Sequence, residues 1–338
     1  MARPQAAPPG IAVIGCGAWG RNHVRTLAAL GALSAVNDAH GDRAAAAAAA
    51  AGVEVRSFED VLAETAIDGV VIATPDGTHA ELAAAALEAG KHVLVEKPMA
   101  TSVAEGAHLA ALAEDRGLVL MAGHILLFHP GFLRLVDLAR GGALGSVRHI
   151  ASKRLHIARG EPRHALWDLA PHDVSMILAL TGALPAAVQG FAAAPIAGAP
   201  PQEARLLLTF AGGVSADISL SAVHPIKLHQ IAVAGTSAYG IFEDSAEWAD
   251  KLRLVRPGLG GYGSADTQAS VEAMPLDPSE PLRLELEAFL DAIGGGGTPA
   301  SGPGEALDVV RVVAAAERSI AQGIAVNLDR APHDNLET

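Results

Sequence analysis

The stretch Ile11–Gly20 reads IAVIGCGAWG and decides the fold of the N-terminal half of the chain. A short apolar run typical of a strand leads into a Gly-x-Gly-x-x-Gly turn, and helical periodicity follows. Gly15 permits a tight turn, Gly17 lets backbone amides approach a pyrophosphate, and Gly20 lets the helix pack closely on the strand. The motif therefore predicts a strand, turn and helix that bind a dinucleotide.

A carboxylate at the end of the next predicted strand supports this interpretation and distinguishes two cofactors. Asp38 follows Gly20 by 18 residues, where its side chain can accept hydrogen bonds from the adenosine ribose hydroxyls. Its charge would repel the 2′-phosphate of NADP, and only Arg43 nearby could offset that charge. We therefore expect NAD as the cofactor rather than NADP.

Around this motif, short apolar runs alternate with segments of helical periodicity, which indicates parallel strands joined by helices. Residues 11–122 are thus predicted to form an α/β domain with a doubly wound parallel sheet, the Rossmann fold. Residues 1–10 are rich in proline and alanine and are expected to be a flexible tail. The predicted strands are Ile11–Ile14, Leu33–Asn37, Gly69–Ala73, His92–Val95 and Val119–Ala122, and the predicted helices are Gly20–Leu30, Arg43–Ala51, Phe58–Glu64, Thr78–Ala89 and Val103–Arg116.

Beyond residue 122, strand-like segments follow one another without intervening helices, which indicates a mostly antiparallel sheet. Residues 123–330 are predicted to form an α+β domain for substrate binding and oligomerisation that includes the C-terminal helices. The predicted strands are Val147–Ile157, Ala187–Ala192, Ala204–Phe210, Val214–Ala222, Ile226–Ala234, Gly240–Glu243 and Leu252–Val255, and the predicted helices are Phe132–Arg140, Pro171–Leu180, Pro281–Ile293 and Glu305–Ala321.

Composition excludes several classes of protein. The net charge is −13, from 24 basic and 37 acidic residues, which argues against a nucleic-acid surface. Cys16 is the only cysteine, so an intrachain disulfide or a cysteine-based zinc site cannot form. The first residues lack the apolar segment of a signal peptide, and the longest apolar stretch, Leu118–Phe128, is too short to cross a membrane. We expect a cytoplasmic protein without membrane or nucleic-acid partners.

Two further segments carry the residue types that alcohol oxidation needs. Lys97 directly follows the fourth predicted strand, at the carboxyl edge where open α/β sheets bind ligands. Asp168 and His172 stand four residues apart at the predicted entrance of a helix, with Pro171 in its first turn. A base must remove the hydroxyl proton as hydride leaves carbon, and a cation stabilises alkoxide character. Either Lys97 or His172 could be the proton acceptor.

These motifs, in this order and at these separations, resemble the Gfo/Idh/MocA family, the group of glucose–fructose oxidoreductase and inositol dehydrogenase. The resemblance runs from residue 11 to about residue 325 and includes Glu96-Lys97-Pro98 and Asp168-x-x-x-His172. It implies Lys97 and His172 in catalysis, Asp168 as the residue that orients or modulates them, and a cis peptide bond before Pro98. The implied cofactor-binding residues are Gly15, Gly17, Ala18, Trp19, Gly20, Asp38, Thr74, Pro75, His79, Glu96, Lys97, His124 and Trp167.

A basic segment is the main sequence indication of the substrate. Residues Arg148–His164 hold five basic residues and one acid, so the segment is net +4 within an acidic chain. Such a strand and loop could hold an anionic group near the reacting carbon, although charge also protects exposed strand edges. The predicted substrate-binding residues are Lys97, Arg154, Arg159, Arg163, Asp168 and His172.

Within the family, the segments Gly123–Pro130 and Trp167–Asp173 look most like the branch that oxidises nucleotide sugars, particularly the UDP-N-acetylglucosamine 3-dehydrogenases. A free sugar or inositol dehydrogenase, an NAD-dependent glycosidase and a non-catalytic NAD-bound sensor are the alternatives. The joint presence of Lys97, Asp168 and His172 argues against the sensor. By the same resemblance we expect a homodimer or homotetramer.

A metal site is the competing interpretation of the histidines and carboxylates near the predicted helix entrance. Their spacing would allow ligands on one face, but the family needs no metal and hydride transfer to NAD does not require one. We therefore predict no metal. The residues concerned are His164, Asp168, His172 and Asp173.

Overall fold

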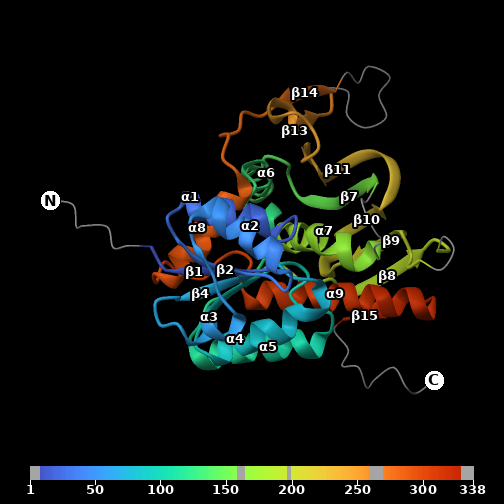
Figure 1. Cartoon of the computed structure of the whole chain (residues 1–338). Helices are drawn as coiled ribbons and strands as arrows, with labels where there is room; N and C mark the ends of the chain where they lie inside the picture. Colours follow the sequence, from blue (N-terminus) through green and yellow to red (C-terminus); the bar gives the residue numbers. More distant parts are fainter. Residues whose placement is uncertain (1–7, 158–163, 196–198, 259–268, 329–338) are drawn as a thin grey trace. The chain divides into compact units, whose positions relative to one another are not determined.

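The computed structural model describes residues 8–157, 164–195, 199–258 and 269–328. The chain divides into two compact units. The first comprises Met1–Ile125 with Glu280–Val310, and the second comprises Leu126–Ser279 with Arg311–Thr338. Figure 1 labels the elements of both units, which are described separately below.

The first unit is built on a six-stranded sheet whose strand order is β3-β2-β1-β4-β5-β6. Every pair is parallel, as the alternating sequence pattern predicts, so the Rossmann fold is confirmed. Because helices cover both faces of such a sheet, the central strands are buried throughout and read as apolar runs. The strands are β1 (Ile11–Ile14), β2 (Leu33–Asn37), β3 (Glu54–Val55), β4 (Gly69–Ile72), β5 (His92–Val95) and β6 (Leu120–Ala122).

Local signals fix the ends of the helices in this unit. The side chains of Ser57 and Ser102 accept backbone N–H groups and so cap two of them, α3 and α5. Gly52 and Gly117 adopt the left-handed conformation that ends α2 and α5. The helices are α1 (Gly20–Ala29), α2 (Gly41–Ala51), α3 (Phe58–Ala63), α4 (His79–Glu88) and α5 (Val103–Arg116), with a 3-10 turn η1 (Asp76–Thr78).

The C-terminal helices differ from the predicted domain division. Helix α8 (Pro281–Ile293) and the first part of α9 (Pro303–Gln322) belong to the first unit, although the sequence pattern assigned them to the second domain. Leu307 is the reason, because it joins the apolar core of the first unit with Met99 and Leu109. Gly106 on α5 leaves room for that side chain, since a Cβ there would lie 3.2 Å from a Leu307 methyl carbon.

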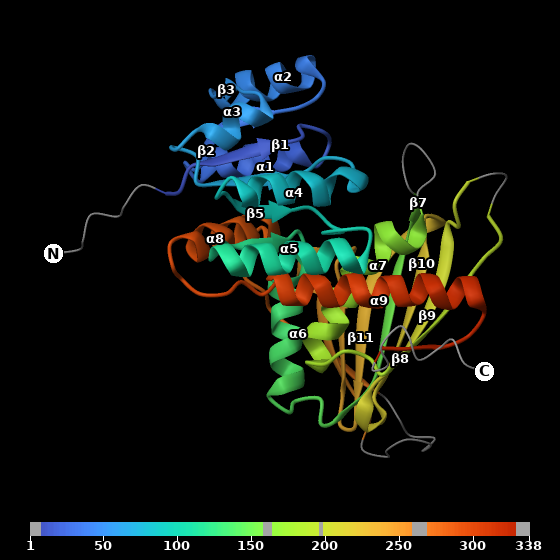
Figure 2. The ribbon, with the colours of Figure 1, turned by 90° about the horizontal axis from the view of Figure 1, so that it is seen from below.

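The second unit is built on a nine-stranded sheet in the order β14-β13-β12-β11-β7-β10-β9-β8-β15. Its pairs are antiparallel except for β7 with β10, so the predicted mostly antiparallel sheet is confirmed. Figure 2 shows β7 to β11 side by side. The strands are β7 (Val147–Ile157), β8 (Ala187–Ala192), β9 (Glu203–Thr209), β10 (Ser215–Ser221), β11 (Val223–Gly235), β12 (Tyr239–Glu243), β13 (Leu252–Arg256), β14 (Ser270–Ala273) and β15 (Val326–Asn327).

Helices pack on one face of this sheet. Helix α7 (Ala165–Thr181) contacts β7, β9 and β10, and α6 (Pro130–Arg140) contacts β12 and β13. Strand β9 accordingly alternates between exposed and buried residues, with Leu206 and Leu208 in the core. The remaining short turns are η2 (Ile125–Phe128), η3 (Ala211–Gly213) and η4 (Trp248–Asp250).

Candidate active site

The glycine-rich turn after β1 has the geometry that a dinucleotide requires. Gly15 has a φ of 94°, and a Cβ there would lie 2.5 Å from the Ala73 carbonyl oxygen. A Cβ on Gly20 would overlap the Gly15 carbonyl oxygen, so helix α1 can approach the turn this closely only with glycine. At Gly17 a Cβ would meet open space, which leaves its backbone accessible to a pyrophosphate. These residues fit NAD.

The predicted ribose-binding carboxylate is held against the same turn. Asp38 Oδ2 accepts the Cys16 N–H at 2.7 Å, and Oδ1 accepts the His40 N–H at 2.7 Å. Each carboxylate oxygen has a second lone pair, so both can still accept from ribose hydroxyls. Ala18 and Trp19 lie exposed at the variable positions of the turn. Cys16 is buried, and burial together with Asp38 raises the pKa of its thiol to about 11.

The loop that carries Lys97 is anchored by buried groups. The Lys97–Pro98 peptide bond is cis, as the resemblance implies. Glu96 Oε1 lies 2.7 Å from Nε2 of the fully buried His23 on α1, and Glu96 Oε2 accepts the Lys97 N–H at 3.2 Å. The Glu96 carboxylate thus points into the domain, toward α1, and holds the backbone of the proposed catalytic lysine.

A second buried histidine, His79, links this loop to the segment after β4. Its Nδ1 lies 2.8 Å from the Pro98 carbonyl oxygen, and its Nε2 lies 2.9 Å from the Thr74 carbonyl oxygen. The Thr78 hydroxyl donates to the Thr74 hydroxyl at 2.8 Å. The structure therefore places His79 between the predicted cofactor-binding segment Thr74-Pro75 and the loop of Lys97.

At the end of the neighbouring strand β6, a third buried histidine is paired with a carboxylate. His124 Nδ1 lies 2.7 Å from Glu305 Oε2, in the first turn of α9. The structure thus brings Lys97 and the cofactor residues of the N-terminal domain to one sheet edge. Sequence reasoning identified His79 and His124 but missed His23 and Glu305. The close spacing of His23 to Gly20 was the only available signal for it, and nothing local indicated Glu305.

In the second unit, α7 presents the other proposed catalytic residues. Asp168 lies in the first turn and His172 one turn later, so the two share a face. The predicted helix start is wrong. The helix begins at Ala165 because the buried residues Ala165 and Leu166 extend its apolar face, so Pro171 lies inside the helix and removes one backbone N–H donor.

Trp167, predicted to bind the cofactor, lies on the same helix. Its indole N–H donates to Glu317 Oε1 at 2.9 Å. Both residues belong to the second unit, and this contact fixes the orientation of the indole ring.

The role predicted for Arg154 in holding an anionic substrate is not what the structure indicates. Its guanidinium is buried and donates from Nε to Asp173 Oδ2 at 2.6 Å, which neutralises its charge. Lys153 is exposed and, as the adjacent strand residue, points to the opposite face of the sheet. Arg159 and Arg163, the other predicted anion ligands, lie outside the described residues.

Beside Arg154, the sheet carries two imidazoles that sequence reasoning did not single out. His156 Nδ1 lies 3.1 Å from His229 Nε2 on the neighbouring strand β11. Burial, with the Arg154 charge as the next cause, lowers the pKa of His229 to about 3, so this ring is neutral at physiological pH. The neutral imidazole of His229 can hydrogen-bond a hydroxyl but carries no charge to hold a phosphate.

A third imidazole of the second unit, His129, stacks on Trp248 and is also buried. Burial lowers its pKa to about 4, and the charge of Asp244 partly opposes that shift. Asp244 also accepts from Lys251 at 3.1 Å, which helps to lower the pKa of that carboxyl. His129 is therefore a neutral ring that packs in the core of this unit.

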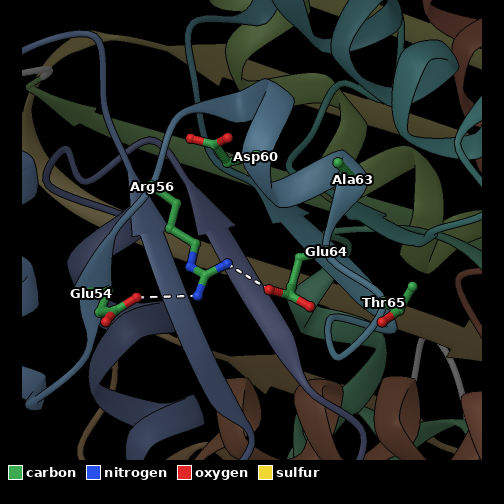
Figure 3. A pocket seen from close by; sticks show the side chains of 6 residues that line it. All are labelled: Glu54, Arg56, Asp60, Ala63, Glu64 and Thr65. Carbon is green, nitrogen blue, oxygen red and sulfur yellow. Dashed lines mark hydrogen bonds and ion pairs between the residues drawn. The ribbon is translucent and has the colours of Figure 1, made fainter.

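A surface cavity of about 480 Å³ lies in the first unit and is lined by residues of the segment 54–65. Arg56 projects into it and donates to Glu64 at 2.7 Å and to Glu54 at 3.1 Å, which raises the pKa of the guanidinium (Figure 3). Asp60 adds a further acid to its lining. The arginine charge is thus already neutralised, and none of the predicted site residues lines this cavity.

Two structural findings concern metals and membranes. Among the described residues, no group of three or more histidine, cysteine or acidic side chains is arranged to hold a metal ion. Asp173, one of the four candidate ligands, instead binds Arg154. None of the described helices combines the length and apolar character of a membrane span.

Family models match most of the chain. Residues 10–124 match the oxidoreductase family with an NAD-binding Rossmann fold, and residues 132–239 match the Gfo/Idh/MocA C-terminal domain. The chain belongs to the Gfo/Idh/MocA family. This Gfo/Idh/MocA protein is an NAD-dependent oxidoreductase, so the family, enzyme class and cofactor inferred from the motifs are confirmed.

Two Gfo/Idh/MocA relatives are similar over most of its length. UDP-N-acetylglucosamine 3-dehydrogenase of Acidithiobacillus ferrooxidans is 32% identical over 287 residues, which cover 83% of this chain and 87% of the relative. Inositol 2-dehydrogenase 1 of Saccharopolyspora erythraea is 30% identical over 325 residues, which cover 91% of each chain.

Solved structures of this family share both domains. UDP-N-acetylglucosamine 3-dehydrogenase GnnA from Acidithiobacillus ferrooxidans has a TM-score of 0.81 at 28% identity and covers 92% of this chain and 97% of its own. GenD2 from gentamicin A biosynthesis, in complex with NAD, has a TM-score of 0.82 at 26% identity. The match covers 98% of this chain and 99% of GenD2. This Gfo/Idh/MocA protein therefore shares its fold with both GnnA and GenD2.

Proposed function

We propose that this chain oxidises the 3-hydroxyl of a nucleotide sugar of the UDP-N-acetylglucosamine class to a 3-keto sugar, with NAD as the hydride acceptor. The observation that carries the proposal is the 32% identity to a UDP-N-acetylglucosamine 3-dehydrogenase over 83% of the chain. The structural similarity to that enzyme, with a TM-score of 0.81, supports it. The motifs around His124 and His172 point to the same branch.

The proposed roles follow from the chemistry of each group. Gly15, Gly17 and Asp38 would hold NAD, which supplies the hydride acceptor when bound. Lys97 stabilises negative charge on the substrate oxygen, and Lys97 or His172 takes the hydroxyl proton. Asp168, one helical turn before His172, orients the imidazole.

The structure changes how a nucleotide diphosphate would be held. Because the charge of Arg154 is neutralised by Asp173 and Lys153 points to the opposite face of the sheet, neither supplies the anion site. The proposal that the basic segment binds the diphosphate therefore rests on Arg159 and Arg163. The neutral imidazole of His229, with His156 beside it, fits the sugar hydroxyls.

A panel of substrates tests the proposal. UDP-N-acetylglucosamine, other UDP-sugars, free N-acetylglucosamine and myo-inositol are incubated with NAD, while absorbance reports NADH and mass spectrometry reports the product. We expect NADH and a product lacking two hydrogen atoms with UDP-N-acetylglucosamine. Turnover of myo-inositol or free sugar without turnover of any UDP-sugar would overturn the proposal.

Inositol dehydrogenase is the second candidate function. One inositol 2-dehydrogenase matches a larger share of the chain, 91%, at 30% identity. A cyclic polyol presents only hydroxyls, so it would need no anion site. The substitution of Arg159 and Arg163 by glutamine separates the two candidates. It should raise KM for a UDP-sugar about tenfold or more and leave KM for inositol unchanged.

A further inference from the structure

The buried imidazole of His124 is held by a carboxylate from a distant part of the sequence. His124 is 1% exposed, and its Nδ1 lies 2.7 Å from Glu305 Oε2, 181 residues along the chain. Glu305 lies in the first turn of the 20-residue helix α9, where the helix dipole favours a negative charge. The short distance is typical of a charge-assisted hydrogen bond.

This pair is continuous with the loop of Lys97. Gly123, which precedes His124, donates its N–H to the Val95 carbonyl at the end of β5. A Cβ on Gly123 would lie 3.2 Å from the Glu96 Cα, so the two strand ends pack directly against each other. The Ser301 carbonyl accepts the Ala122 N–H at 3.0 Å, which fixes the start of α9 to the end of β6.

The contact determines which nitrogen of His124 carries hydrogen. A carboxylate only accepts hydrogen bonds, so Nδ1 must be the donor, and in the neutral ring Nε2 then holds a lone pair. Two buried oxygens at the same helix start, Glu305 Oε1 and Ser301 Oγ, have no hydrogen-bond partner among the described residues. The start of α9 therefore holds polar groups that a polar ligand can satisfy.

We propose that Glu305 is a positioning residue for cofactor binding, which holds His124 with Nε2 as a hydrogen-bond acceptor at the sheet edge where the dinucleotide binds. NAD offers matching donors in its carboxamide N–H and ribose hydroxyl groups. The inference rests on the proposed cofactor-binding role of His124. It adds that Glu305, which need not contact NAD, acts through the imidazole.

The tautomer of His124 tests the first step. Nitrogen-15 NMR of the full chain labelled at histidine, with His124→Asn to assign the signal, should show a hydrogen on Nδ1 and none on Nε2. In Glu305→Ala this preference should disappear. A wild-type ring that carries its hydrogen on Nε2, or on both nitrogens, would overturn the proposal.

A double-mutant cycle tests the second step, with the dissociation constant of NAD as the readout. Glu305→Ala and His124→Ala should each weaken NAD binding about tenfold, and the double variant should lose no more than His124→Ala alone. Losses that multiply would show that Glu305 does not act through His124. Failure of the wild type to bind NAD would instead contradict the proposed function.

Two further variants control for folding and for charge. Glu305→Gln keeps the shape and an acceptor oxygen, so it should recover most of the NAD affinity, and an affinity loss as large as in Glu305→Ala would contradict the positioning role. If the alanine variant does not fold, the tautomer of His124 in the wild type still tests the proposal. Glu287→Ala removes an exposed carboxylate of α8 that pairs with Arg283 and should leave NAD affinity unchanged. Loss of affinity in Glu287→Ala equal to that in Glu305→Ala would count against a specific role for Glu305.

Discussion

Glu285 on α8 is a carboxyl group that the folded chain should keep protonated. Its side chain is fully buried, and neither oxygen has a hydrogen-bond partner among the described residues. Burial, with the negative charge of Glu96 as the second cause, raises the pKa of Glu285 well above its ordinary value of 4.5. Replacing it with glutamine preserves the shape and removes the possibility of ionisation.

The sign of the effect follows from proton linkage. Between the unfolded and the raised folded pKa of Glu285, the folded chain binds one proton that the unfolded chain has lost. The contribution of Glu285 to the free energy of unfolding is therefore fully present below the unfolded pKa. It declines by about 1.4 kcal/mol per pH unit as pH rises toward the folded pKa. Glu285→Gln lacks this dependence. Its free energy of unfolding should therefore rise relative to that of the wild type by about 1.4 kcal/mol for each pH unit in this range.

Urea denaturation followed by circular dichroism, at about pH 5.5 and about pH 6.5, measures this difference. Glu287→Gln is the matched control, since that carboxylate is exposed two residues away on the same helix and should give a difference that does not change with pH. If the difference in free energy of unfolding between Glu285→Gln and the wild type is equally independent of pH, Glu285 ionises freely in the folded chain and the reasoning is refuted.

Three further predictions concern the cofactor, the chemistry and the assembly. NAD should bind more tightly than NADP in titrations, and Asp38→Ala should reduce the difference between the two affinities. Equal affinities in the wild type would contradict the role of Asp38. Lys97→Ala and His172→Ala should each lower turnover roughly a hundredfold or more while the chain stays folded and binds NAD, as stopped assays and NAD titration would show; full activity in His172→Ala would exclude it as an essential base. The chain should form a dimer or tetramer, because the sheet of the second unit exposes large apolar side chains such as Phe191 and Leu207; a monomer mass by light scattering at micromolar concentration would count against this.

Much of the fold could be predicted because its signals are local. The glycine turn and the buried apolar runs of β1 and β4 specify the parallel sheet without reference to distant residues. The strand Glu54–Val55 was missed because it is two exposed residues long and carries no alternation. The placement of Leu307 in the first core could not be predicted either, since no pattern within α9 distinguishes which core its apolar face will join.

The site was predictable where a residue follows a strand and unpredictable where its partner is remote. Lys97 and His124 lie just beyond the ends of β5 and β6, which sequence periodicity locates. The pairing of Arg154 with Asp173 depends on the packing of α7 across β7, so charge counting alone treated a neutralised arginine as an anion ligand. Arg154 is paired with Asp173 because a buried cation needs a carboxylate partner.

The most direct test of the central claim follows the hydrogen itself. UDP-N-acetylglucosamine carrying deuterium at C3 is incubated with the enzyme and NAD, and the reduced cofactor is isolated and weighed by mass spectrometry. If the chain oxidises the 3-hydroxyl, the reduced cofactor carries one deuterium and the sugar product has lost it. Unlabelled NADH, or a product in which the deuterium remains at C3, would contradict the proposed function.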